Sequence, residues 1–72
     1  MTVEDFDMQE YQKRVVEEKR ELDAKLSKLC EFKYTNSFAG LPFAEQERLN
    51  TQGHIMCQYS AILGARIAAF TD

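Results

Sequence analysis

Residues 35–42 read TNSFAGLP, and this short segment separates two long stretches that share one hydrophobic period. Apolar residues recur every seventh position before it and again after it. The two ladders are Met8, Val15, Leu22, Leu29 and Leu49, Met56, Leu63, Phe70. A seven-residue apolar period is typical of helices that pack along a shared seam. Because Gly40 and Pro42 interrupt the pattern, the sequence predicts two helices folded back on each other.

The predicted fold is all-α: two long antiparallel helices form a helical hairpin in a single domain, residues 1–72. We expect a helix at about 3–34, a turn at 35–41 and a helix at about 42–70. Acidic residues follow Thr2, and carboxylates suit the positive end of a helix dipole, which favours a helix start there. A chain of 72 residues buries only about 60% of its unfolded surface, so we expect the hairpin to assemble into a homo-oligomeric bundle.

Charge and cysteine content narrow the functional classes. The net charge of −3 and the pI near 5.1 argue against binding to duplex nucleic acid, which needs a basic face. When the helices pair about the turn, Cys30 and Cys57 lie roughly 13 Å out of level, which is too far for a disulfide. The sequence has no signal peptide and no long apolar run, so we expect a cytoplasmic protein without membrane contact.

A stripe of small side chains runs along the second helix beside the ladder. Two glycines inside a helix each cost about 1 kcal/mol relative to alanine, which favours a packing role for the stripe. We interpret it as an oligomer interface, and the alternative is a locally weak helix. The interface residues are Gly53, Cys57, Ser60, Ala61, Gly64 and Ala68.

Polar residues follow the ladder positions at an offset of three, and the predicted pairing brings them to common levels. Counting outward from the turn places Lys25 by Gln52, Glu18 by Tyr59 and Tyr11 by Arg66. Arginine offers a bidentate fork to an anion, and tyrosine offers a flat face with a hydroxyl group. The predicted ligand-binding residues are Tyr11, Arg14, Lys25, Tyr59 and Arg66.

The same polar band has a structural interpretation. Glu18 can pair with Arg14 and Tyr59, and Tyr11 can pack under Arg66. The band would then fix the register of the hairpin and its oligomer without binding any ligand.

Catalytic and metal chemistry find little support in the sequence. His54 and Cys57 are three residues apart on one helix, but no second pair of metal ligands lies level with them. Neither cysteine has a recognisable nucleophile signature, and no phosphate loop or dinucleotide turn occurs. We therefore expect no enzyme, no catalytic residue, no cofactor and no metal.

A resemblance to a known family adds to this interpretation. The pattern is carried by Tyr11, Gln12, Arg14, Val15, Glu18, Leu22, Lys25, Leu29 and Phe32, and then by Arg48, Leu49, Gln52, Met56, Tyr59, Leu63, Arg66 and Phe70. Over Tyr11 to Phe70 the chain resembles the short phage-encoded helical hairpins known as crAss-phage-related small proteins, which implies a phage origin. Its architecture also resembles that of phage sponges, which oligomerise and hold cyclic nucleotides or ADP-ribose-derived immune signals between subunits.

Three functional hypotheses follow. The first is a phage accessory protein, acting in the infected bacterial host, that counters antiviral defence by sequestering a small nucleotide signal at oligomer pockets. The second is an acidic protein-binding inhibitor of the anti-CRISPR type, motivated by the carboxylates of the first helix. The third is a purely structural small oligomer.

Overall fold

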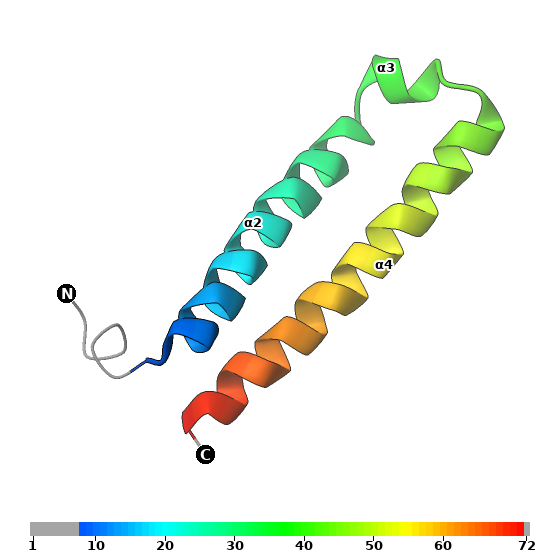
Figure 1. Cartoon of the computed structure of the whole chain (residues 1–72). Coiled ribbons are helices and arrows are strands. Elements are labelled where there is room, and N and C mark those ends of the chain that lie inside the picture. The colour runs from blue at the N-terminus through cyan, green and yellow to red at the C-terminus, as the bar shows by residue number, and fades with distance from the viewer. Residues whose placement is uncertain (1–7, 72) are drawn as a thin grey trace.

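The computed structural model describes residues 8–71, which are all-helical apart from short connections. Helix α2 (Glu10–Phe32) and helix α4 (Phe43–Ala68) lie side by side and antiparallel. The short helix α3 (Asn36–Ala39) joins them, and a 3₁₀ turn, η1 (Ala69–Thr71), follows α4 (Figure 1). The chain measures 48 × 21 × 14 Å, so it is one layer of two helices. The predicted all-α fold with two long packed helices is confirmed.

Helix α2 begins at Glu10, later than the acidic N-terminal sequence suggested. Met8 and Gln9 are not helical. The backbone N–H of Gln9 donates a hydrogen bond to Oε1 of Gln12 at 2.8 Å, and this contact caps the helix start. The predicted start near residue 3 lies outside the described residues.

The connection between the helices is ordered by its own contacts. Thr35 Oγ1 donates to the carbonyl of Phe32 at 2.6 Å and accepts from the N–H of Phe38 at 3.2 Å, so one side chain serves the end of α2 and the start of α3. The Phe32 and Phe38 rings meet edge to face with centroids 5.9 Å apart. Helix α2 therefore ends at Phe32, two residues before the predicted end at residue 34. Pro42 is the N-cap residue of α4, which begins at Phe43.

The seam between α2 and α4 contains all eight ladder residues, each buried or half-buried. Its second row lies four residues after the ladder residues and continues to Gln46, seven residues before Gly53, whereas the sequence analysis placed polar groups beside the seam at an offset of three. On α4 the offset of three would bring Arg66 into the seam, and burying an unpaired charge is costly. At the offset of four α4 instead presents uncharged side chains to α2. The second row consists of Gln12, Lys19, Leu26, Lys33, Gln46, Gly53, Ser60 and Ile67.

The levels of the hairpin are also shifted from the predicted pairing. Tyr11 meets Phe70, with ring centroids 6.0 Å apart, so the predicted level of Tyr11 with Arg66 is wrong. Gly53 lies beside Leu29. The cause is visible in Figure 1, because α4 extends past the end of α2 and α3 fills part of that offset. A pairing counted symmetrically from the turn cannot include this overhang.

The core of the described chain is small. Val15 is 5% exposed and Leu63 is fully buried, and these are the only buried apolar side chains among residues 8–70. The remaining ladder residues each keep one side open to solvent. No described helix is both long enough and apolar enough to cross a membrane.

Candidate functional site

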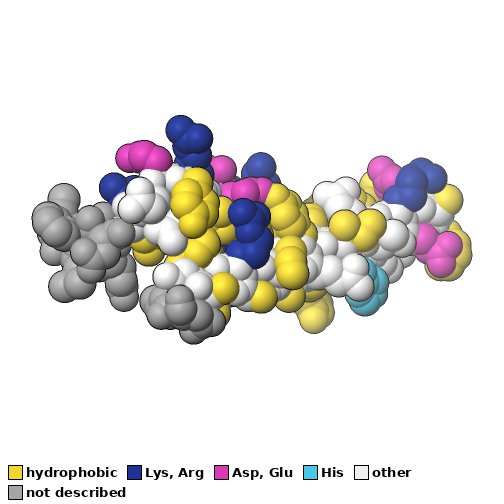
Figure 2. All heavy atoms as spheres, turned by 60° about the horizontal axis from the view of Figure 1, so that its bottom comes forward, with side chains coloured by type: hydrophobic (Ala, Val, Ile, Leu, Met, Phe, Trp, Pro, Cys, Tyr) yellow, Lys and Arg dark blue, Asp and Glu magenta, His cyan; other side chains and the backbone are white. Residues whose placement is uncertain are grey.

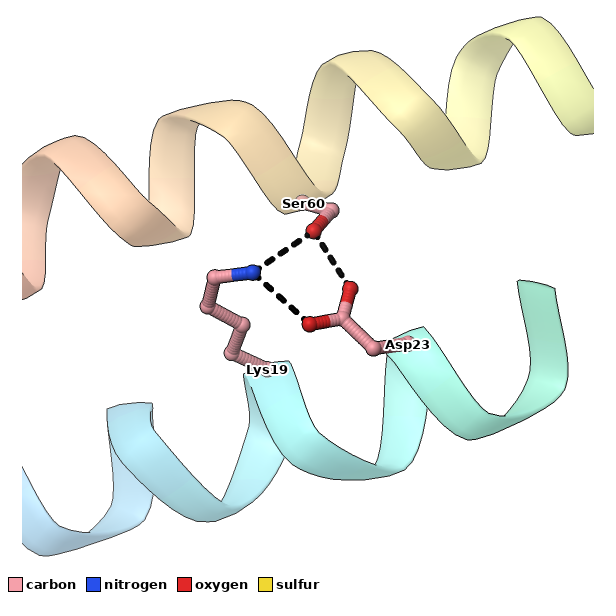
Figure 3. A network of polar contacts seen from close by, with 3 residues as sticks. All are labelled: Lys19, Asp23 and Ser60. Carbon is pink, nitrogen blue, oxygen red and sulfur yellow. Dashed lines mark hydrogen bonds and ion pairs between the residues drawn. The ribbon is translucent and has the colours of Figure 1, made fainter. Parts of the chain in front are cut away.

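A polar network joins the two long helices in the middle of the seam (Figure 3). Lys19 Nζ on α2 donates to Asp23 Oδ2 at 2.7 Å and to Ser60 Oγ on α4 at 2.9 Å. The Ser60 hydroxyl in turn donates to Asp23 Oδ1. The three side chains close a ring, and Ser60 is the point at which α4 is bonded to α2.

This network has an electrostatic consequence. The hydrogen bond from Lys19, followed by the one from Ser60, lowers the pKa of the Asp23 carboxyl below its ordinary value. The Lys19 ammonium is bonded to these two partners, so it is already paired and bridges the two helices. The network therefore serves the fold.

Sequence reasoning missed this network. Lys19 and Asp23 are four residues apart, a spacing at which a helix brings a lysine and a carboxylate together. The signal that identifies them is the offset of four from the ladder, where Lys19 and Ser60 both lie.

All five predicted ligand-binding residues lie on the surface. Tyr11 is 58% exposed and Tyr59 is 42% exposed, and the remaining three are cations that are also exposed. Among residues 8–71, no hydrogen bond, ion pair or ring contact joins any two of the five. They form an open surface with no internal contacts.

These residues lie along one flank of the hairpin, which we call the cation–tyrosine flank: Tyr11, Arg14, Lys25, Tyr59 and Arg66. Tyr11 and Lys25 each follow a ladder residue of α2 by three positions, and Tyr59 and Arg66 do the same on α4. In an antiparallel pair of helices, equal offsets from the facing row fall on the same side of the seam. Arg14 lies one turn from Tyr11 on that side.

The cations of this flank lack acidic partners among the described residues, as do Lys28 and Lys33, whereas four other described cations are paired. Elsewhere, Arg20 is paired with Glu17 at 2.6 Å, and this hydrogen bond raises the pKa of its guanidinium. Arg48 likewise pairs with Glu45 at 2.7 Å. By contrast, no described carboxylate forms an ion pair with the three flank cations, which are Arg14, Lys25 and Arg66.

In the structural interpretation of the polar band, its residues bond to one another, and the described residues do not make these contacts. In the described chain, Glu18 makes no hydrogen bond to Arg14 or to Tyr59, and Tyr11 packs against Phe70. The contact that the flank makes across the hairpin is the ring contact of Tyr11 with Phe70. The hydrogen bonds that join α2 to α4 come from the network around Ser60.

A shallow depression lies elsewhere, at the start of α4, lined by Ala44, Glu47, Arg48 and Thr51. All four side chains are exposed, and none belongs to the cation–tyrosine flank. It offers one arginine that is already paired with Glu45, so its chemistry is that of an ordinary helix surface.

The small residues of the predicted interface on α4 fall into two groups, one that contacts α2 and one that is exposed to solvent. A Cβ at Gly53 would contact Leu29 and Lys33, a Cβ at Gly64 would contact Lys19, and Ser60 is bonded to Lys19. These three residues face α2 of the same chain, so their close packing needs no second chain to explain it. The other members of the predicted interface are exposed: Cys57, Ala61 and Ala68.

The two cysteines are free and exposed. Within the part of the chain that the structure describes, no group of three histidine, cysteine, aspartate or glutamate residues is placed to hold a metal ion. The cation–tyrosine flank itself offers three cations that form no ion pair in the described chain and two exposed tyrosine side chains.

The fold defines a small helical-hairpin protein with exposed arginine, lysine and tyrosine side chains along one flank. Residues 9–69 match the Sequestin family model, and the chain belongs to the Sequestin family. The family name indicates a sequestering function, which is a binding role. No curated protein matches the chain, and no solved structure matches it. The phage origin that the sequence resemblance implies stays a prediction.

Proposed function

We propose that this protein is a non-enzymatic phage accessory protein that sequesters a small nucleotide immune signal and so counters host antiviral defence. The ligand is an anion with an aromatic base, of the cyclic nucleotide or ADP-ribose-derived class. Sequestration takes place in the cytoplasm of the infected bacterium, at pockets between copies of the chain. Membership in the Sequestin family supports the sequestering role.

One structural observation carries the proposal: the cation–tyrosine flank is exposed and has no acidic partner. Arginine and lysine there retain their full capacity to bind phosphate, because no described carboxylate competes for them. Tyr59 and Tyr11 present partly exposed rings on which a base can stack. The flank is open within one chain, which is consistent with pockets that are completed by a second copy.

The acidic-inhibitor hypothesis rests on carboxylates of which two are paired, whereas Glu21 forms no ion pair in the described chain. Glu17 is bonded to Arg20, and Glu10 lies 4.0 Å from Lys13. Paired carboxylates make a weaker decoy for a basic channel than free ones do.

The test is calorimetric titration of ligand-free protein, refolded from denaturant, with a panel of cyclic nucleotides and cyclic ADP-ribose isomers. We expect one class to bind. Loss of a charge-assisted hydrogen bond in the variant Arg66→Gln costs about 1.5–3 kcal/mol, which weakens binding by about 10- to 100-fold. Arg20→Gln is the matched control, because Arg20 is an exposed arginine already paired with Glu17, and its affinity should match that of the native protein.

Two results would contradict the proposal. The first is the absence of heat and of a melting shift across the whole panel. The second is recovery of a chemically altered ligand after the complex is denatured, because sequestration returns the ligand intact and catalysis does not.

A further inference from the structure

The cation–tyrosine flank also carries a carboxylate, Glu18. This residue follows the ladder residue Val15 by three positions. Tyr11 and Lys25 have the same offset, so Glu18 lies with them on one side of the seam. Tyr11, Arg14 and Glu18 occupy three successive turns of α2 on that side. An aromatic ring, a guanidinium group and a carboxylate therefore follow one another along the helix.

Glu18 is exposed and has no partner in the part of the chain that the structure describes. Arg14 precedes it by four residues, a spacing at which a helix brings opposite charges within reach, yet neither an ion pair nor a hydrogen bond joins the two. Opposite charges are paired elsewhere, and Figure 2 shows acidic and basic side chains grouped on the face in view. The Glu18 carboxylate therefore keeps both oxygens available as hydrogen-bond acceptors.

The other described carboxylates without an ion pair have different surroundings. They are Glu21, Glu31 and Glu47. The pKa of the Arg20 guanidinium is raised by Glu17 and, to a smaller extent, by the charge of Glu21, so Glu21 already has a cation nearby. Glu31 and Glu47 each lie two positions from the nearest ladder residue, which places them off the flank. Glu18 is thus the carboxylate best placed to meet a ligand that the flank cations hold.

A free carboxylate among phosphate-binding cations selects for hydrogen-bond donors on the ligand, because it repels phosphate and donates no hydrogen bond itself. Guanine presents two adjacent donors on its Watson–Crick edge, N1–H and the 2-amino group, and these match the two oxygens of one carboxylate. Adenine and cytosine place one donor beside an acceptor, and uracil places its one donor between two acceptors. Each of those three bases brings a lone pair toward a carboxylate oxygen, so guanine is the base that fits Glu18.

We propose that Glu18 binds the Watson–Crick edge of guanine and makes the flank selective for cyclic nucleotides that contain guanine. Tyr11 stacks the base, Arg14 binds a phosphate, and Glu18 accepts hydrogen bonds from N1–H and the 2-amino group. This inference rests on the proposed function, because it concerns the same site. It narrows the ligand class, since signals derived from ADP-ribose carry adenine and leave the Glu18 carboxylate without its donors.

Calorimetric titration of ligand-free, refolded protein with cyclic di-GMP, its inosine analogue and cyclic di-AMP tests the selectivity. The inosine analogue differs from cyclic di-GMP only in lacking the 2-amino group, so the ribose and phosphate contacts are the same. Because one hydrogen bond to a charged acceptor is lost with that group, the native protein should bind cyclic di-GMP about 10- to 100-fold more tightly. Cyclic di-AMP should bind at least as weakly as the inosine analogue.

The variant Glu18→Gln provides a measurement that a purely structural role would not change. A glutamine amide offers one acceptor and one donor, an arrangement that suits adenine and mismatches guanine. We expect Glu18→Gln to lose the preference for cyclic di-GMP over the inosine analogue and to bind cyclic di-AMP more tightly than the native protein does. Glu31→Gln is the matched control, because Glu31 is also an exposed α2 carboxylate without an ion pair, and it should keep the native preferences.

Failure of this inference and failure of the proposed function give different results. Equal affinity of the native protein for the three nucleotides, or an equal loss of affinity for all three in Glu18→Gln, would overturn the role of Glu18 and leave sequestration standing. Tighter binding of cyclic di-AMP than of cyclic di-GMP by the native protein would do the same. Absence of binding to every nucleotide of the panel would overturn both proposals.

Discussion

Two neighbouring levels of the α2–α4 seam hold the helices together by different means. At one level Val15 and Leu63 are shielded from water, Leu63 completely. One turn away, the ring formed with Ser60 bonds the helices through Lys19 and Asp23, whose side chains stay 29% and 46% exposed. Burying a leucine stabilises a fold by about 1.5–3 kcal/mol, whereas an exposed ion pair contributes about 0–1 kcal/mol. The apolar level therefore supplies stability, and the polar level supplies alignment, because directional bonds are lost when the register slips.

The largest effect is expected when the apolar level is broken. Leu63→Ala truncates the fully buried side chain of the seam and leaves a cavity there. We expect the free energy of unfolding to fall by about 2–5 kcal/mol, a large part of the stability of so small a domain. Urea denaturation followed by circular dichroism measures it.

Tyr34→Ala is the control for this change, because it truncates a large side chain that is 92% exposed. Its free energy of unfolding should change by less than about 0.5 kcal/mol. Equal midpoints for Leu63→Ala and the native protein would show that the Leu63 level is not the core.

An intermediate effect is expected at the two glycines of the seam. A Cβ at Gly53 would lie 3.0 Å from Nζ of Lys33, the free end of a flexible side chain, and 3.5 Å from Cδ2 of Leu29. The lysine end can move away, so Gly53→Ala should gain the helix propensity of alanine, about 1 kcal/mol, and raise the melting temperature by a few degrees.

Comparing Gly64→Ala with Gly53→Ala tests whether a hydrogen-bonded lysine, Lys19, yields less easily to a new methyl group than Lys33 does. A Cβ there would lie 3.4 Å from Cε of Lys19, whose ammonium is bonded to Asp23 and Ser60. Because Lys19 has less freedom to move than Lys33, we expect a smaller gain. A lower melting temperature for Gly53→Ala than for the native protein would mean that Lys33 does not yield.

The sequence predicted one half of the seam correctly and missed the other half for a physical reason. The seven-residue ladders are regular enough to fix helix type, pairing and the burial of Val15 and Leu63. They do not distinguish an offset of three from an offset of four, because 3.6 residues per turn lies between the two. The choice depends on which side chains the partner helix presents, and Lys19 was overlooked because a lysine in a seam looks like a surface residue.

The candidate site was predictable only as a set of residue types. Which cations are neutralised cannot be predicted from the sequence, since pairing depends on rotamers and on neighbours such as Glu17 beside Arg20. The structure separates the paired arginines from the unpaired Arg14 and Arg66. The predicted levels could not be right, because the overhang of α4 and the position of α3 are set by the contacts of Thr35 and Phe38.

The smallest effect is expected from acid at the polar level. The pKa of Asp23 is lowered in the folded chain, chiefly by the hydrogen bond from Lys19, so its contribution to stability is present above the ordinary carboxyl pKa of about 3.9. That contribution is lost as the pH falls through the lower pKa of the folded state. Asp23→Asn should therefore be less stable than the native protein at pH 7, and the difference in melting temperature should shrink below about pH 4.

The variant Ser60→Ala separates the two hydrogen bonds, from Lys19 and from Ser60, that lower the pKa of Asp23. It removes the serine hydrogen bond and leaves the Lys19–Asp23 pair, so its melting temperature should retain most of the acid dependence, since the lysine contact is the larger cause. If the difference in melting temperature between the native protein and Asp23→Asn stays constant from pH 7 to pH 3, the fold does not stabilise the Asp23 carboxylate. The polar level would then owe its alignment of the helices to the Lys19–Ser60 bond alone.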